Sequence, residues 1–163
     1  MRRVLCVLGA AASHGELAFV YFEANALRCW SIHRRPLKSL DNAFALTLRW
    51  IGTYQPILMV VPDYERNSRK GNRARAIIEM VASASAEREI ACIRLARPKI
   101  MTNKYAEAAC LAAIYPQLAP IVPAPRRAWD SERHGMLVFE ATALVHDWLW
   151  RNYQGTPSDQ RVA

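Results

Sequence analysis

The clearest chemistry in the sequence comes from a group of cationic side chains. Half of the residues from 66 to 75 are lysine or arginine and none is acidic: Arg66, Arg69, Lys70, Arg73 and Arg75. A basic loop that meets the amino end of a helix would hold phosphate groups through its side chains and through free backbone N–H groups. The alternative interpretation is a solvated charged surface with no ligand.

Two smaller groups share this basic character. They are Arg97, Lys99 and Lys104, and then Arg126 and Arg127 beside Trp129. The indole of Trp129 could stack on an unpaired base. The whole chain carries 22 Lys and Arg against 14 Asp and Glu, a net charge of +8. An excess of this size predicts an anionic partner, with nucleic acid first.

Composition places the chain among folded domains. It has 163 residues, of which 52% are apolar and 22% charged, so we predict one domain over residues 1–153 and a polar tail over 154–163. No apolar run reaches the roughly 18 residues of a membrane helix, and the first residues fit a strand better than a secretion signal. The four cysteines form no CxxC pair, which disfavours a zinc site and indicates buried, reduced thiols in a cytoplasmic protein.

The periodicity changes along the chain and predicts an α/β fold. Three apolar runs predict an antiparallel meander: Val4–Leu8, Leu17–Phe22 and Leu27–Ile32. Two later runs predict parallel strands: Ile57–Val61 and Ile90–Leu95. Helical spacing predicts helices from Ser39 to Gly52, from about Ala76 to Arg88, over Tyr105–Ile114 and over Met136–Tyr153. Four prolines between 116 and 130 predict an extended connection without regular structure. The result is a five-stranded mixed sheet, three antiparallel N-terminal strands plus two parallel, with helices on both faces.

Three passages of the sequence resemble the RuvC-like branch of the ribonuclease-H-like superfamily, the Holliday-junction resolvases and their relatives. The passages are VVPDYERNSRKGNRARAIIEMV, then IACIRLARPKI followed by TNKYAEAACLAAIYPQLAP, and finally PRRAWDSERHGMLVFEATALVHDW. With the N-terminal hairpin, the similarity covers nearly the full chain. It implies a ribonuclease-H-like fold and two-metal hydrolysis of phosphodiesters, with carboxylates from the first strand, the end of the fourth strand and the last helix.

Carried onto this sequence, the resemblance assigns a partial ligand set. Asp63, with Glu65 two residues on, matches the fourth strand and Glu140 matches the last helix. Asp63 and Glu140 are thus the candidate metal ligands, for Mg²⁺ or Mn²⁺ if the protein is active. His134, before the last helix, is a candidate proton shuttle. The plainer interpretations are carboxylates that solvate a turn and a loop histidine with no role.

The first strand departs from the family pattern. Its segment VLCVLGAAASHG has no carboxylate, so Glu16 or Glu23 would have to substitute. We therefore predict a nucleic-acid-binding protein with a degenerate metal site; structured or branched DNA is favoured as its ligand, and the sequence does not decide between DNA and RNA. Two alternatives stay open: an active Mg²⁺-dependent endonuclease with a rebuilt carboxylate set, and a protein-interaction module on an inherited fold. A homodimer through the last helix is expected, because Trp148 and Trp150 cannot both face inward.

Overall fold

Three strands of eight residues begin the chain and form the antiparallel half of one sheet. They are β1 (Cys6–Ser13), β2 (Glu16–Glu23) and β3 (Ala26–His33). The computed structural model describes residues 4–33, 39–65, 70–96, 103–124 and 135–153. Gly15 lies in the turn between β1 and β2 with φ 81°, a left-handed conformation that glycine adopts without steric cost. The predicted meander is confirmed.

The first strand runs further than the sequence predicted. We expected it to end at Leu8, but β1 pairs with β2 without interruption from Cys6↔Glu23 to Ser13↔Glu16. Glycine and alanine have low strand propensity, which is why the segment after Leu8 was not predicted as a strand. Here propensity is overridden by packing, because Gly9 and the alanines after it lie under helices that need small residues beneath them.

The parallel half of the sheet follows through helical crossovers. Its elements are α1 (Leu40–Tyr54), β4 (Leu58–Pro62), α2 (Asn72–Glu87) and β5 (Ala91–Leu95). β4 pairs in parallel with both β1 and β5, and the sheet order is β3-β2-β1-β4-β5. The predicted five-stranded mixed sheet is confirmed. Because β1, β4 and β5 run the same way, their carboxyl ends lie at one edge of the sheet.

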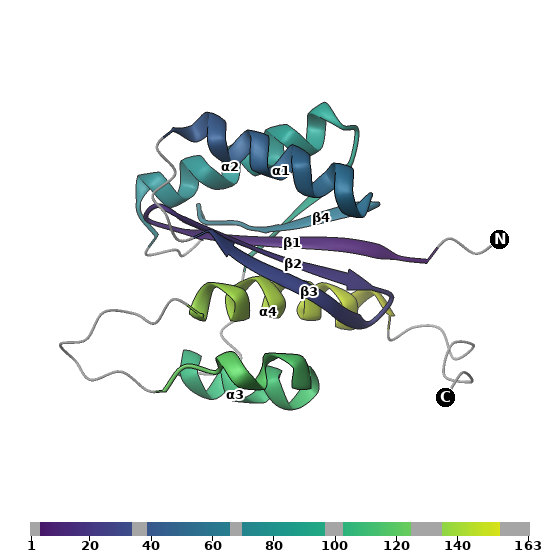
Figure 1. The fold of residues 1–163 in the computed structure, drawn as a ribbon, viewed down its shortest axis with the longest axis vertical. Helices are drawn as coiled ribbons and strands as arrows, with labels where there is room; N and C mark the ends of the chain where they lie inside the picture. The colour runs from purple at the N-terminus through teal and green to yellow at the C-terminus, as the bar shows by residue number, and fades with distance from the viewer. Residues whose placement is uncertain (1–3, 34–38, 66–69, 97–102, 125–134, 154–163) are drawn as a thin grey trace.

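Helices cover both faces of the sheet (Figure 1). α1 and α2 lie on one face and α4 (Met136–Tyr153) lies on the other, with α3 (Lys104–Ile114) outside α4. Alternate residues of the strands supply the two cores. On the α4 face, Val7, Ala11 and Val60 pack with Phe139 and Leu144. The opposite face packs Leu8, Ala10 and Met59 against residues of α1 and α2.

Two predicted element boundaries were wrong. α1 was expected to end at Gly52, but it continues to Tyr54 and is capped by Gln55 in the left-handed conformation, φ 47°. Residues 116–121 were expected to lack regular structure, yet Pro116–Ile121 forms the 3-10 helix η1 around the buried Leu118. A proline in the first turn does not oppose a helix, because the N–H that it lacks would have no partner there.

The expected burial of the cysteines was also only partly right. Cys6, Cys29 and Cys92 are half-buried and Cys110 is exposed, and all four are free thiols.

Trp150 is 60% exposed, while Trp148 packs against the core, as their helical spacing requires. No helix in the described part of the chain is both long and apolar enough to cross a membrane.

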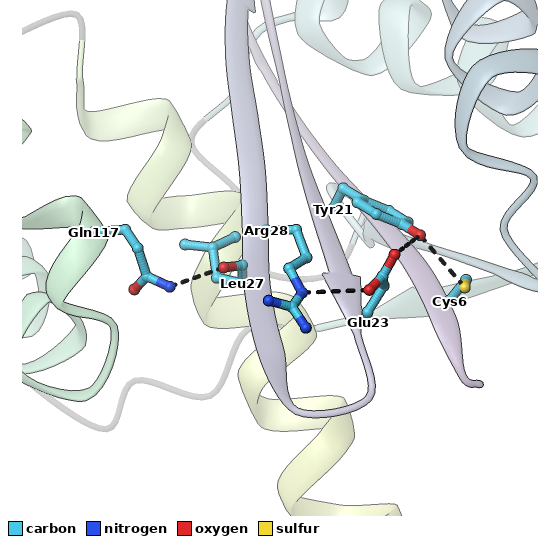
Figure 2. A network of polar contacts seen from close by, with 6 residues as sticks. All are labelled: Cys6, Tyr21, Glu23, Leu27, Arg28 and Gln117. Atoms are coloured by element: carbon cyan, nitrogen blue, oxygen red, sulfur yellow. Dashed lines mark hydrogen bonds and ion pairs between the residues drawn. The ribbon is translucent and has the colours of Figure 1, made fainter.

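A network of polar contacts lies at the amino end of β1 (Figure 2). The Tyr21 hydroxyl donates to Glu23 Oε1 at 3.0 Å and lies 3.4 Å from Cys6 Sγ, and Arg28 Nε lies 3.3 Å from Glu23 Oε2. Burial, followed by these hydrogen bonds, raises the pKa of Tyr21. Gln117 Nε2 donates to the Leu27 carbonyl at 2.9 Å and ties η1 to β3. Acidic and basic groups are paired with each other at this end.

α4 lies close against β1 at Gly9, and this contact gives a stability prediction. A Cβ at this position would collide with Val145 Cγ2, lie 2.9 Å from Val20 Cγ2 and lie 3.2 Å from the Ala141 carbonyl oxygen. Gly9→Ala should therefore lower the free energy of unfolding by about 1–3 kcal/mol, as measured by urea denaturation.

Gly52→Ala is the matched control, because nothing lies within 4 Å of a Cβ on this exposed residue in α1. It should raise stability by about 0.5–1 kcal/mol, the usual gain from replacing a helical glycine. Equal stability of the two variants would show that α4 does not pack on β1 as described.

Candidate nucleic-acid interface and carboxylate site

The site begins where β1 and β4 separate. The two strands pair in parallel from Val7↔Leu58 to Gly9↔Val60, and beyond that point β1 continues alongside β2 alone. The edge of β1 that β4 leaves still carries backbone N–H and C=O groups, and buried groups of this kind need partners. Ala12, which is fully buried, lies on this part of the strand.

Tyr64 supplies the missing partners. It follows β4 by two residues, and its hydroxyl accepts a hydrogen bond from the Ala12 N–H at 3.1 Å and lies 2.9 Å from the Ala12 carbonyl oxygen. The same hydroxyl donates to Glu140 Oε1 at 2.8 Å. With one proton for two acceptors, the charged carboxylate is the stronger partner. Tyr64 therefore joins β1, β4 and α4 at the carboxyl end of the sheet.

Glu140 also forms an ion pair with Lys70. Lys70 Nζ lies 3.1 Å from Glu140 Oε2, with the two side chains 26% and 12% exposed, and 5.7 Å from the centre of the Tyr64 ring. The ring faces a cation at a distance that is favourable for a cation–π contact. A carboxylate with little access to water needs a charge partner, and Lys70 provides it from the residues just before α2.

The other two candidate carboxylates lie at the end of β4. The Asp63 N–H donates to the Leu95 carbonyl at 2.8 Å, which extends the β4–β5 pairing by one residue. Asp63 Oδ1 accepts from the Glu65 N–H at 3.2 Å, and Glu65 itself is exposed. A side chain that bonds to the backbone two residues on is an ordinary turn contact. His134 lies outside the described residues.

These residues do not fit the two-metal site that the fold implies. A hard divalent cation takes about six oxygen ligands, several of them carboxylates in such sites. Within the described residues, no group of three or more His, Cys, Asp or Glu side chains is placed to hold a metal ion. On the face of β1 toward α4, the buried side chain at the end of the strand is Ala11, and the Glu140 carboxylate is already paired with an ammonium group.

Basic side chains gather around the start of α2 and α3. Four of the predicted phosphate-binding residues are described: Lys70, Arg73, Arg75 and Lys104. The other predicted binding residues lie outside the described part of the chain: Arg66, Arg69, Lys99, Arg126, Arg127 and Trp129. α2 has Gly71 as its N-cap, no side-chain cap and no acidic residue in its first turn. Its amino end therefore keeps the positive end of the helix dipole.

α2 follows β4 and begins at the carboxyl edge of the sheet, and α3 follows β5, the neighbouring parallel strand. In Figure 1 the amino ends of α2 and α4 lie at the same side of the molecule, beyond the end of β1. The contact between Lys70 and Glu140 independently joins these two regions. Lys70, two residues before α2, thus lies next to the carboxylate site.

Two contributors to this region were missed in the sequence. Tyr64 stands between the two acids of PDYE, but a tyrosine that bonds to a distant backbone leaves no spacing pattern. Arg94 in β5 forms a two-pronged pair with Glu79 in α2, at 2.6 and 3.0 Å, and this contact lowers the pKa of Glu79. The pair fixes α2 against the edge strand, so the basic amino end of α2 is held in place.

The end of α4 away from the site has its own contacts. Asp147 Oδ2 pairs with Arg151 at 3.0 Å, and residues four apart on a helix are neighbours on its surface. The Tyr115 hydroxyl lies 2.8 Å from His146 Nδ1 and links α3 to α4. Burial lowers the pKa of His146 and raises the pKa of Tyr115 to about 12. None of these groups contacts Glu140 in the described structure.

Comparison with known proteins supports the fold. No protein-family model matches the sequence, and no curated protein matches it. Among solved structures, Thermus thermophilus RuvC in complex with a Holliday junction substrate has a TM-score of 0.63 at 13% identity, over 90% of this chain and 94% of that chain. The fowlpox virus Holliday junction resolvase has a TM-score of 0.61 at 10% identity, over 90% and 99%. The large terminase nuclease of thermophilic phage G20c has a TM-score of 0.55 at 12% identity, over 90% and 83%.

These similarities define the architecture as ribonuclease-H-like. More specifically, it is the resolvase-type fold of RuvC, as the three passages of the sequence indicated. Similarity at 10–13% identity shows the fold alone. The activity of this chain must come from the chemistry of its own residues.

The hydroxyl of Tyr64 gives a stability prediction. Tyr64→Phe leaves the buried Ala12 N–H and one side of Glu140 without their partner, so the free energy of unfolding should fall by about 1–3 kcal/mol in urea denaturation.

The matched control is Tyr105→Phe, because the Tyr105 hydroxyl is buried with no hydrogen-bond partner among the described residues. Removal of that oxygen should leave stability unchanged or higher. If the two substitutions cost the same, the Tyr64 hydroxyl is not the bridge that the distances indicate.

Proposed function

We propose that this protein binds nucleic acid through the basic residues at the carboxyl end of its sheet, and that it recognises structured or branched DNA without two-metal cleavage. The observation that carries the proposal is the position of Arg73 in the first turn of α2, a helix start without a side-chain cap, three residues after the Lys70 that already balances the charge of Glu140. A polyanion there meets a cation and the positive end of the helix dipole.

Several features support a nucleic acid rather than an acidic protein. The net charge of +8 gives a long-range attraction to a polyanion. The basic residues come from two separate helix starts, at α2 and α3, as an extended phosphate backbone would require. Two structural neighbours, T. thermophilus RuvC and the fowlpox virus resolvase, were each solved with a Holliday junction. Those complexes make branched DNA the first substrate to test.

The rival proposal is an active endonuclease with a rebuilt carboxylate set. It is favoured by Glu140, which keeps an acidic group on the last helix, and by Asp63 at the end of β4. The phage terminase nuclease of similar fold has been solved with bound magnesium. Against it stand Ala11 on β1 and the ammonium of Lys70 on Glu140.

DNA binding is tested by fluorescence anisotropy with labelled junction, duplex and single-stranded DNA. We expect the junction to bind most tightly and the logarithm of its affinity to fall linearly with the logarithm of salt concentration. Arg73→Ala should weaken binding and reduce the slope by about 1, as expected for one lost phosphate contact. Absence of binding at about 50 mM salt would rule out the proposal.

Arg88→Ala is the matched control for Arg73→Ala. Arg88 is the C-cap of the same helix, about 22 Å from Arg73 at 1.5 Å per residue. Its removal takes away the same charge at the opposite end of α2, so affinity should change little. Equal losses from the two substitutions would point to overall charge and not to a defined interface.

The same DNA incubated with Mg²⁺ or Mn²⁺ decides between binding and cleavage. The proposal expects intact DNA on a denaturing gel. Cleavage that disappears in both Asp63→Asn and Glu140→Gln would instead establish the endonuclease. DNA binding would then stand, and only the statement about catalysis would fall.

We also propose that the protein forms a homodimer through the exposed end of α4. Trp150, 60% exposed, stacks on His146 with ring centres 6.2 Å apart, and Ile114 of α3 is 52% exposed. Apolar side chains that form one exposed patch mark interaction surfaces. Light scattering after gel filtration should give twice the chain mass of 18.5 kDa for the wild type and a single chain mass for Trp150→Ser.

Ile57→Ser controls for the loss of an exposed apolar side chain elsewhere. Ile57 is 48% exposed and belongs to the connection between α1 and β4, outside the α3 and α4 residues of the proposed interface. This variant should keep the dimer mass. A single-chain mass for the wild type would refute the dimer and leave the proposed DNA interface untouched.

A further inference from the structure

The Lys70–Glu140–Tyr64 group has a feature that nucleic-acid binding does not explain. Lys70 is one of the basic residues, yet its ammonium group lies only 3.1 Å from a carboxylate oxygen and over an aromatic ring. Its side chain is 26% exposed, so the charge is turned toward the protein. A lysine that served only to bind phosphate would have no need of a fixed anionic partner.

The position of this ammonium group is informative. It lies beside a carboxylate of α4 and near the end of β1, at the carboxyl edge of the parallel strands. Both Glu140 oxygens are engaged: Oε2 lies 3.1 Å from Lys70 Nζ, and Oε1 accepts from the Tyr64 hydroxyl, which lies 2.9 Å from the Ala12 carbonyl oxygen. A carboxylate, a hydroxyl and a carbonyl are oxygen donors of the kind that bind a hard cation.

We propose that the Lys70 ammonium is the resident cation of this site, and that it takes the place of a metal ion by balancing Glu140. The proposal deepens the non-cleaving part of the proposed function. It follows that divalent cations do not bind next to Glu140 in the wild-type protein, and that loss of Lys70 creates a weak oxygen-lined site for them.

Charge balance explains why the replacement is stable. Glu140 has a side chain only 12% exposed, so its negative charge is costly unless it is paired. Because Lys70 is part of the chain, its ammonium group reaches Glu140 without the loss of translational entropy that accompanies the binding of a free ion. The neighbouring side chain of β1, Ala11, adds no second negative charge, so one positive charge is sufficient for the carboxylate. A divalent ion would leave the site with excess positive charge.

The first test is a double-mutant cycle with Lys70→Met and Glu140→Gln, read as melting temperature. Lys70→Met leaves Glu140 unbalanced, and we expect a fall of about 3–6 °C. Adding Glu140→Gln removes the unpaired charge and should restore most of that loss. If the two effects simply add, the ammonium does not balance Glu140 and the proposal fails.

The second test measures Mn²⁺ binding by the change in melting temperature at constant ionic strength. With a Kd of about 1 mM, about 10 mM Mn²⁺ should raise the melting temperature of Lys70→Met by about 3–5 °C. The wild type and the Lys70→Met/Glu140→Gln double variant should show no such rise. Lys104→Met, which removes one lysine from the first turn of α3, should also be unresponsive.

Each outcome decides the matter. If Mn²⁺ raises the melting temperature of the wild type and Glu140→Gln abolishes that rise, a metal ion binds at Glu140 and displaces Lys70. If Mn²⁺ does not raise the melting temperature of Lys70→Met, the Lys70 ammonium does not occupy a position that a metal ion could take. Both readouts are independent of DNA, so failure of DNA binding overturns the proposed function and leaves this inference standing.

Discussion

A carboxylate held away from water must be balanced, and in this protein that requirement fixes the carboxyl end of the sheet. Glu140 reaches the end of β1 because α4 lies close against Gly9, where no side chain separates helix and strand. Its charge is then met by Lys70 from the segment before α2 and by the hydroxyl of Tyr64 from β4. These contacts thus connect the helices on the two faces of the sheet at its carboxyl end. Because the tie is electrostatic, its strength depends on how little water reaches it.

The order of the elements could be predicted because it rests on local periodicity. Short apolar runs marked β2 and β3, and helical spacing marked α4, each close to its observed bounds, while α2 begins at Asn72, four residues before the predicted start. The continuation of β1 could not be predicted in the same way. Gly9 and the alanines after it are poor strand formers, and only their pairing with β2 and the helix above them make the strand.

The acidic residues of the carboxylate site could be predicted from the sequence, but the contacts that they make could not. Asp63 and Glu140 were found because they match positions of a known family, while Tyr64 was passed over although it stands next to Asp63. Lys70 was counted among the phosphate-binding residues because its neighbours are basic. Its partner is 70 positions away in the sequence, and no spacing rule connects residues that far apart.

The bond between Tyr64 and Ala12 runs to main-chain atoms, and this has a consequence for how the sequence is free to drift. Any amino acid except proline presents the same N–H and C=O at position 12, so evolution is limited there mainly by the size of a fully buried side chain. The tyrosine and the glutamate have no such freedom, because each is recognised by its own functional group. Among diverged copies of this gene, we expect positions 64 and 140 to change together, while position 12 varies among small residues independently of both.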